Sequence, residues 1–357
     1  MLRRATGVRV RAQDVLLTRL LQVMAGAHHG GAETFFVRLA LALHRAGQDQ
    51  QVVIRQDPDR AATLRAGSLM PVELPFGSLL DYRTRFGMRR ILREYRPRVV
   101  LTWMSRATRL CPRGEFVHVG RLGGYYDLKY YRRCDHLIGN TRDILAYLAR
   151  SGWPENRIHY LPNFVPDMKA ARIARASLDT PEGVPLALAL GRLHHNKAFD
   201  ILIGAVARAP DIHLWLAGEG PDRARLEAHA RRLAVGNRVK FLGWRDDTPA
   251  LLATADMLVC PSRHEPLGNV VIEAWAAGTP VVAASSAGPA ALIRDGVNGL
   301  LVPVEDADAL ARAMMRIAQS RTLRNELTAG GRSVHAAEFS ERVVVAQYRD
   351  FIERVAR

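Results

Sequence analysis

Two glutamates, Glu265 and Glu273, stand eight residues apart in the segment 262–274. Glu265 precedes a predicted helix that begins near Gly268, and Glu273 lies two turns into that helix. A carboxylate accepts hydrogen bonds from two hydroxyl groups, so Glu273 suits the diol of a ribose and Glu265 the hydroxyls of a second sugar. The N–H groups of the first helical turn have no partner within the helix and can bind a phosphate. Apolar neighbours favour a functional Glu273 over an ordinary exposed one; they are Val270, Val271, Ile272 and Trp275.

A second loop, from Gly191 to Lys197, combines two cations that suit a diphosphate. Arg192 can engage two phosphate oxygens as a planar fork, and Lys197, five residues later, acts as a point charge. The alternative is a solvated basic turn, which would be the better interpretation of an isolated pair. The glycine that precedes the pair, and the apolar run before that glycine, favour a binding loop.

Glycine-rich loops occur at three further places. A loop with Gly218, Glu219 and Gly220 follows an apolar run, and 241–244 follows the next one; together they could wall a pocket for a base. Near the N-terminus, 30–33 reads Gly-Gly-Ala-Glu, and such a glycine pair lets the backbone approach a phosphate or sugar closely. Each of these loops could equally be an ordinary turn.

Short apolar runs alternate with amphipathic stretches along the whole chain, which predicts parallel sheets covered on both faces. Predicted strands are 19–25, 50–55, 98–103, 115–121, 135–139 and 157–161, then 185–190, 212–217, 238–242, 256–260, 279–284 and 299–302. Predicted helices are 32–46, 142–150, 199–208, 222–234, 269–277, 307–319 and 321–337. All the loops described above follow strands, and in open sheets of this class ligands bind at that edge.

The length of 357 residues favours two domains. A stretch rich in Pro, Ala and Arg separates the two sets of strands. We therefore expect an N-terminal domain over 1–165, a linker over 166–184 and a C-terminal domain over 185–340. A final helix over 341–357 could pack back on the N-terminal domain.

The composition is that of a globular protein, with 24% charged and 48% hydrophobic residues. The three cysteines are far apart, so they form neither a disulfide framework nor a zinc site, and the histidines show no His-Glu-x-x-His pattern. No metal is expected. Arginines near the N-terminus and at Arg19 break up any secretory signal. The uncharged stretch 274–293 is interrupted by Gly278 and Pro280, so a helix, turn and strand are expected there instead of a membrane span.

The net charge of +16 is concentrated in the first half of the chain. Residues 1–165 hold 27 Lys and Arg against 13 Asp and Glu, whereas residues 166–357 hold 24 against 22. The segment Arg83–Arg98 carries an arginine stripe on a predicted helix and could lie against an anionic membrane surface. The alternatives are a packed helix with a solvated Arg face and, for the whole chain, nucleic-acid binding. Nucleic acid is not expected, because no recognition motif is present.

The glutamate pair resembles the donor signature of retaining GT-B glycosyltransferases of family 4. Ala274, Gly278, Thr279, Pro280 and Val281 match the usual continuation of that signature. The loops at 191–197, 218–221, 241–243 and 295–302, and the glycine loop at 30–33, resemble other landmarks of the family in the same order. The resemblance covers about residues 19–340.

This resemblance implies an α/β fold of two facing Rossmann-like domains with parallel sheets and an interdomain cleft. It implies a sugar transfer from a UDP- or GDP-linked donor to a glycan or lipid-linked acceptor of cell-surface polysaccharide or lipopolysaccharide, without a cofactor. The expected location is cytoplasmic, at the inner face of the cell membrane. Arg192, Lys197 and Glu265 would be catalytic, the first two by neutralising the donor diphosphate. The donor-binding candidates are Gly31, Gly191, Glu219, Leu267, Gly268, Asn269, Val270 and Glu273.

Two positions depart from the family pattern. Where members carry a histidine near the acceptor, this chain has Leu122, Gly123 and Gly124, and His118 lies upstream as the nearest acceptor-side candidate. Where members often carry a glutamate, this chain has Ala291. A catalytically silent nucleotide-binding scaffold therefore remains the competing hypothesis.

Overall fold

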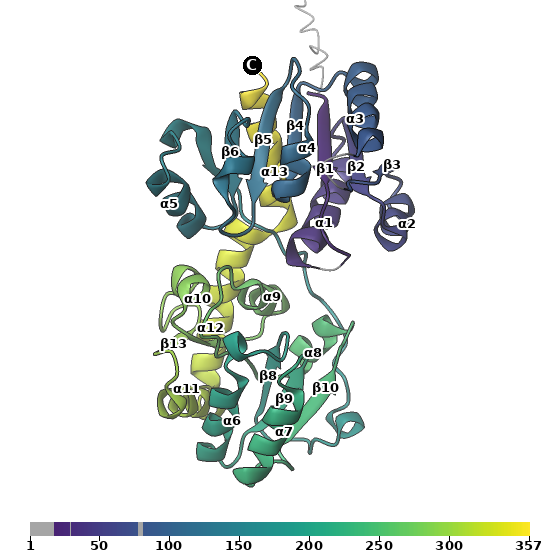
Figure 1. Cartoon of the computed structure of the whole chain (residues 1–357). Coiled ribbons are helices and arrows are strands. Elements are labelled where there is room, and N and C mark those ends of the chain that lie inside the picture. The colour runs from purple at the N-terminus through teal and green to yellow at the C-terminus, as the bar shows by residue number, and fades with distance from the viewer. Residues whose placement is uncertain (1–17, 29, 78–80) are drawn as a thin grey trace, which may run out of the picture. The chain divides into compact units, whose positions relative to one another are not determined.

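The computed structural model describes residues 18–28, 30–77 and 81–357 (Figure 1). The first sheet is parallel in every pair of strands whose register is resolved, and has the strand order β3-β2-β1-β4-β5-β6-β7. Its strands are β1 (Leu20–Met24), β2 (Gln50–Arg55), β3 (Pro71–Leu74), β4 (Val99–Trp103), β5 (Val117–Leu122), β6 (His136–Gly139) and β7 (Ile158–Tyr160).

The second sheet is parallel, in the order β10-β9-β8-β11-β12-β13. Its strands are β8 (Leu186–Leu190), β9 (His213–Ala217), β10 (Val239–Gly243), β11 (Met257–Cys260), β12 (Val281–Ala284) and β13 (Leu300–Val302). Both sheets run outward from their first strand in one direction and then resume on its other side, which is the doubly wound Rossmann order. The predicted class of two parallel-sheet α/β domains is confirmed.

Helices connect the strands in both halves of the chain (Figure 1). Those of the first half are α1 (Gly31–Arg45), α2 (Pro58–Ala66), α3 (Tyr82–Tyr95), α4 (Met104–Leu110) and α5 (Arg142–Arg150). Those of the second half are α6 (Phe199–Arg208), α7 (Arg223–Arg232), α8 (Thr248–Thr254), α9 (Asn269–Ala277), α10 (Ala287–Leu292), α11 (Ala307–Gln319) and α12 (Arg321–Val334). The last helix is α13 (Glu341–Val355).

The central strands are buried on both faces, which explains their apolar sequences. Every residue of β1, β4, β11 and β12 is buried. Helices on both faces of a parallel sheet leave neither side to water, so these strands read as continuous apolar runs and not as alternating ones. The edge strand β3 is only half-buried throughout, and it begins with Pro71, a position where an edge strand needs no N–H donor.

The chain divides into two compact units. The first consists of the residues up to Val119 together with Arg349–Arg357, and the second runs from Gly120 to Tyr348. The core of the first unit packs side chains of β1, β2 and β4 against α3 and α4, around Val23, Val53, Met88 and Val100. Within this unit Arg98 donates a hydrogen bond of 2.7 Å to the carbonyl of Ala356. The second unit packs β8–β13 against α6, α9 and α11.

All twelve predicted strands occur within two residues of their predicted bounds, whereas β3 was not predicted. The stretch 274–293 forms the end of α9, then β12 and α10, as expected in place of a membrane span. Nowhere in 18–28, 30–77 and 81–357 does a helix combine the length and apolar character needed to cross a membrane. The expectation that the chain has no secretory signal rests mostly on residues 1–17. These residues lie outside the described part of the chain.

Candidate functional site

The loops that follow β8 and β11 diverge from the middle of the second sheet. β8 pairs with both β9 and β11, so it is the central strand of the sheet. From β8 the chain proceeds to β9 on one side, and from β11 it proceeds to β12 on the other side. This is the topological switch point, where the carboxyl ends of the strands leave a crevice for ligands. Arg192 and Lys197 lie in the first of these loops and Glu265 in the second.

The structure brings Lys197 and Glu265 together. The ammonium group of Lys197 contacts Oε2 of Glu265, although the two residues are 68 positions apart. Glu265 is 9% exposed, and its other oxygen accepts a hydrogen bond of 3.3 Å from the N–H of Gly268. The ammonium that could meet a phosphate is thus held in place by a carboxylate, which also offsets part of its charge. Since Gly268 already donates to Glu265, its N–H is not the best phosphate donor of this loop.

Arg192 differs from Lys197, because its side chain is exposed and has no ion-pair partner within the described chain. It lies one residue after Gly191, whose φ of 145° is in the region that favours glycine. The unpaired guanidinium and the paired ammonium belong to the same loop at the end of β8. Arg192 can therefore engage an anion without first giving up a protein partner.

The helix α9 starts directly after the second loop. Gly268 precedes it with a φ of 75°, and the helix begins at Asn269. No acceptor in the described part of the chain is bonded to the N–H groups of Asn269 and Val270. A helix start of this kind carries partial positive charge and two free donors, so it favours an anion. Glu273 lies half-buried on the same helix, and its role toward a ribose stays a prediction.

Arg263 ties the two loops to each other, which the sequence did not indicate. Its guanidinium donates to both carboxylate oxygens of Asp200, at 2.9 Å each, and to the carbonyl of His195 at 2.8 Å. Burial alone would raise the pKa of Asp200, but the hydrogen bonds and charge of Arg263 outweigh it and hold that pKa below its ordinary value. Asp200 lies at the start of α6, the helix that follows the loop after β8. The pair therefore fixes the loop after β11, which carries Arg263, against α6.

Glycines allow the neighbouring loops to pack backbone against backbone. A Cβ placed on Gly218, whose φ is 147°, would lie 2.0 Å from the carbonyl oxygen of Gly191. A Cβ on Gly220 would lie 2.3 Å from the carbonyl oxygen of Leu193. The loop after β9 therefore supports the loop that carries Arg192. Its glutamate, Glu219, is exposed and accepts a hydrogen bond of 2.7 Å from Arg223, so it is held beside α7.

The glycine loop near the N-terminus surrounds a buried glutamate. Glu33 is 5% exposed and accepts a hydrogen bond of 2.8 Å from the N–H of Ala27. A Cβ on Gly26 or Gly30 would come within 2.2 Å or 2.3 Å of the Glu33 carboxylate, so these glycines make room for it. Gly31 has open space around its Cα. Its expected role as a donor-binding residue stays a prediction.

His118 lies inside β5 and is 5% exposed. Its Nε2 is 3.0 Å from the hydroxyl of Thr102 on β4. This bond accounts for a buried polar side chain, and the acceptor role of His118 gains no support from it. Ala291, the other position that departs from the family pattern, is exposed on α10.

Two Asp-x-Asp strings occur in the sequence, at 57–59 and 306–308, and both are accounted for as helix starts. Asp57 accepts a hydrogen bond from the N–H of Arg60 at the start of α2, and Asp306 accepts one from Ala309 at the start of α11. A search of the described residues finds no group of three or more His, Cys, Asp or Glu suited to a metal ion.

The two doubly wound parallel sheets define an α/β protein of the Rossmann class, and a basic loop and a helix start lie at the switch point of its second sheet. Residues 171–334 match the family described as glycosyl transferases group 1, and residues 29–168 match glycosyltransferase family 4. The chain is 38% identical over 328 residues to the lipopolysaccharide core biosynthesis glycosyltransferase LpsE of Rhizobium meliloti (strain 1021), covering 89% of this chain and 94% of the relative. LpsD of the same organism, which carries the same description, is 35% identical over 91% of this chain and 95% of its own. The chain therefore belongs to the glycosyltransferases of group 1 and family 4, as the motifs predicted.

Solved structures share the fold at low sequence identity. A glycosyltransferase from Rickettsia africae superposes with a TM-score of 0.84 at 18% identity, covering 96% of this chain and 99% of that one. Anabaena Alr3699/HepE, crystallised in complex with UDP, superposes with a TM-score of 0.82 at 19% identity, covering 94% of this chain and 100% of that one. At this identity the likeness shows the architecture alone.

Proposed function

We propose that this glycosyltransferase moves a sugar from a UDP- or GDP-linked donor to a lipopolysaccharide or related glycolipid acceptor, with retention of configuration and without a metal ion. The observation that carries the proposal is the set of groups at the switch point of the second sheet. A free guanidinium, a lysine paired to a buried carboxylate and an unpaired helix start all belong to two adjacent loops. The descriptions of LpsE and LpsD support the lipopolysaccharide acceptor. The UDP complex of the Anabaena neighbour supports the nucleotide donor.

The chemistry breaks the bond between the anomeric carbon of the sugar and the terminal phosphate oxygen of the donor. Negative charge then grows on the departing nucleoside diphosphate. Arg192, Lys197 and the start of α9 would stabilise that charge, because they are fixed in place before the reaction. The acceptor hydroxyl attacks from the face that the leaving group vacates, and its proton passes to a phosphate oxygen of the donor.

Glu265 would serve two purposes in this scheme. One of its oxygens holds the ammonium of Lys197, and the other accepts from the N–H of Gly268. The carboxylate thereby joins the cation loop to the helix start, and its remaining acceptor capacity is available to hydroxyls of the transferred sugar. Glu265 and Glu273 would not act as a glycosidase pair, which requires two carboxylates converging on one bond.

The test is turnover of a panel of UDP- and GDP-linked sugars with truncated lipopolysaccharide as acceptor. We expect release of free nucleoside diphosphate from one donor, unchanged in the presence of EDTA, and an anomeric configuration in the product, read by NMR, that equals that of the donor. Binding of nucleotide without release from any sugar donor would favour the silent scaffold. Inversion of configuration would refute the retaining mechanism, and loss of activity with EDTA would refute metal independence.

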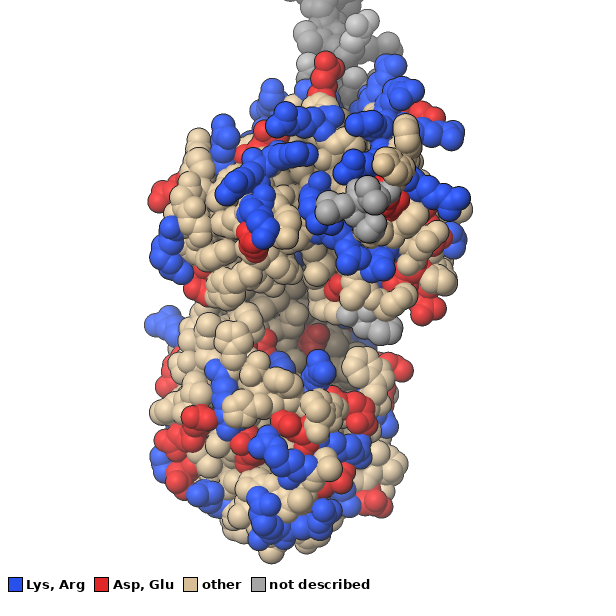
Figure 2. All heavy atoms as spheres, viewed as in Figure 1, with Lys and Arg blue, Asp and Glu red and all other residues tan. Residues whose placement is uncertain are grey.

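We also propose that α3 attaches the protein to the inner face of the cell membrane. Its apolar residues Met88 and Ile91 are buried in the core, so they are not available to lipid. The outer face instead combines Arg83 and Arg85 with Phe86, which is 67% exposed. Figure 2 shows Lys and Arg crowded where Figure 1 labels α3. Such a face gains about 1 kcal/mol per basic residue near an anionic surface.

Sedimentation with anionic vesicles at low salt tests this attachment. We expect the wild-type chain to bind, and the variant Arg83→Gln/Arg85→Gln to bind more weakly. The matched control is Arg312→Gln/Arg316→Gln on α11, which removes the same charge from two other exposed side chains. Absence of wild-type binding at low salt, where screening is weakest, would remove the membrane proposal.

A further inference from the structure

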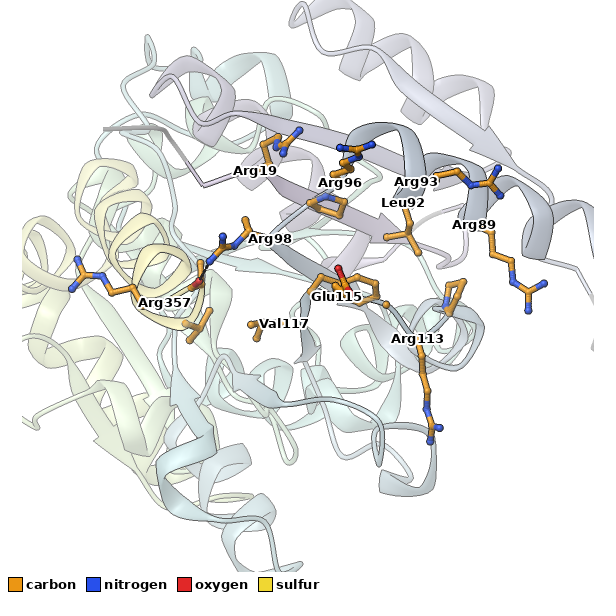
Figure 3. A pocket seen from close by; sticks show the side chains of 16 residues that line it. Arg19, Arg89, Leu92, Arg93, Arg96, Arg98, Arg113, Glu115, Val117 and Arg357 are labelled. Atoms are coloured by element: carbon orange, nitrogen blue, oxygen red, sulfur yellow. Dashed lines mark hydrogen bonds between the residues drawn. The ribbon is translucent and has the colours of Figure 1, made fainter. Parts of the chain in front are cut away.

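A cavity of about 760 Å³ lies in the first unit, and arginines surround it (Figure 3). Segments from four parts of the chain form its walls: the residue before β1, the last two turns of α3 with the three residues that follow it, the stretch that leads into β5, and the residues around the end of α13. Its arginines are Arg19, Arg89, Arg93, Arg96, Arg98, Arg113 and Arg357. Among the described residues that line it, Glu115 has the one acidic side chain. In Figure 3, Glu115 lies among the labelled side chains while the arginines extend around them.

Two of these arginines have a structural explanation. Arg19 donates a hydrogen bond of 2.9 Å to the carbonyl of Tyr95, the last residue of α3. Arg98 donates one of 2.7 Å to the carbonyl of Ala356, just after α13. Basic side chains near a helix C-terminus commonly satisfy its last carbonyls in this way.

The other five arginines have no such explanation. Within 18–28, 30–77 and 81–357, neither they nor the two capping arginines form an ion pair with a carboxylate. Elsewhere in this unit exposed arginines do pair, as Arg65 does with Glu73 at 2.7 Å and Arg90 with Glu94 at 2.8 Å. On α3 the one acid is Glu94, which pairs with Arg90, so the helix offers no carboxylate to Arg89 and Arg93. Many positive charges around one cavity repel each other unless an anion joins them.

The cavity lies at the amino edge of the first sheet, where the strands of that sheet begin. Arg19 and Arg98 directly precede β1 and β4, and Val117 is the first residue of β5. In a parallel sheet the amino ends of all strands lie at one edge and the carboxyl ends at the other. The glycine loop at 30–33 follows β1, so it belongs to the opposite edge. A ligand in this cavity is therefore separate from any ligand bound at the carboxyl ends of these strands.

The size and lining indicate the kind of ligand. A volume of about 760 Å³ falls within the range of about 300–1,000 Å³ that is usual for small-molecule sites, so one phosphate ion would leave most of it unfilled. Arginine forks bind phosphate oxygens two at a time, so arginines spread around a cavity of this size suit a ligand with several phosphate groups. Apolar side chains of Leu92, Phe116 and Val117 also line the cavity, and they suit a ring or short apolar part of the ligand.

We propose that this cavity is a second anion site, which binds a ligand carrying clustered phosphate groups. The site is independent of sugar transfer at the second sheet and of the outer face of α3. Its phosphates could be those of a soluble phosphorylated molecule or of a lipid headgroup, since the same guanidinium chemistry recognises both.

Calorimetric titration of the full-length chain with tripolyphosphate tests the site. All titrations use a parent chain that carries Arg192→Gln and Lys197→Gln, so that the loop 191–197, called the donor loop, does not bind the probe. The pocket variants are Arg89→Gln/Arg93→Gln and, from a separate wall, Arg113→Gln. The matched control is Arg312→Gln/Arg316→Gln, which has the same spacing on the exposed side of α11. None of the side chains replaced in the pocket and control variants makes a described hydrogen bond, so these variants should keep the fold of their parent. Lys197 does pair with Glu265, so thermal denaturation of the parent and of every variant verifies that each is folded.

We expect the double pocket variant to bind tripolyphosphate at least tenfold more weakly, Arg113→Gln to bind severalfold more weakly, and the control to bind as before. Vesicles that contain phosphatidic acid then distinguish the two sources. If they compete with tripolyphosphate, the phosphates are those of a lipid; if they leave its affinity unchanged, the ligand is soluble. Equal affinities in the parent, both pocket variants and the control would overturn the site, and so would the absence of any binding.

Discussion

Replacement of Gly218 by alanine should disable the donor loop while leaving the second sheet folded. The new Cβ would lie 2.0 Å from the carbonyl oxygen of Gly191, whereas real Cβ atoms essentially never approach another atom within 3.0 Å. The two loops must therefore separate by about 1 Å, and the φ of 147° at Gly218 adds backbone strain for any L side chain. The carbonyl that moves belongs to the residue just before Arg192.

The magnitude follows from these contacts. Strain of about 1–3 kcal/mol, together with weakening of the 2.7 Å hydrogen bond from Gly218 to Gly243, predicts a loss of stability of about 2–4 kcal/mol. A displacement of about 1 Å at Arg192, the proposed stabiliser of the leaving diphosphate, predicts a decrease of about 100-fold in kcat/KM.

Two measurements check this prediction: release of nucleoside diphosphate from the sugar donor, and the urea midpoint of unfolding. The control is Gly236→Ala, because the nearest atom to its Cβ would be Arg231 Cγ at 3.8 Å, an ordinary contact. That variant should keep full turnover and an unchanged or slightly higher midpoint, since alanine reduces the entropy of the unfolded chain. Turnover of Gly218→Ala within twofold of the wild type would refute the coupling between the two loops.

Lys197→Gln should lower turnover by about 100-fold or more, because it removes one proposed stabiliser of the leaving group. Glu265→Gln should lower the stability of the protein by about 1–3 kcal/mol, since it leaves the ammonium of Lys197 unpaired. Turnover and urea midpoints of both variants and of the double variant measure the coupling. The lowered pKa of Asp200 means that its ionised form stabilises the fold above about pH 4 and that this contribution is lost as the pH falls below its ordinary value of 3.8. The midpoint difference between wild type and Asp200→Asn should therefore be clear at pH 7 and shrink at pH 3. Burial raises the pKa of the thiols of Cys111 and Cys260 to about 12 and about 11, so iodoacetamide at pH 8 should alkylate neither in the native protein and both in urea.

Strand positions could be predicted because the central strands are buried on both faces and read as unbroken apolar runs. β3 could not, since it has only four half-buried residues and begins with Pro71. The helices α4, α8 and α10 have six or seven residues each, too few for a helical period to stand out. The helices α5 and α9, nine residues each with a buried face, lie at their predicted bounds, whereas α2, also of nine residues, was not predicted.

The candidate site was predictable as a set of loops but not as a set of contacts. The positions of Arg192, Lys197 and Glu265 after adjacent strands follow from the alternation of strands and helices. The pairing of Lys197 with Glu265 joins residues 68 positions apart, and the link from Arg263 to Asp200 joins residues 63 apart. Such contacts depend on how the loops fold over the sheet edge, and no local pattern encodes that.

Part of the excess positive charge of the first half of the chain lies around one cavity of the first unit. In the second unit, Arg223, Arg245 and Arg263 are each paired with nearby carboxylates. In the first unit, unpaired arginines gather around one cavity at the amino edge of the sheet, drawn from segments as far apart as Arg19, Arg113 and Arg357. A charge surplus that served only solubility would be spread over exposed helix faces, where it avoids its own repulsion. Its concentration in a concave, partly apolar place is what a binding site requires.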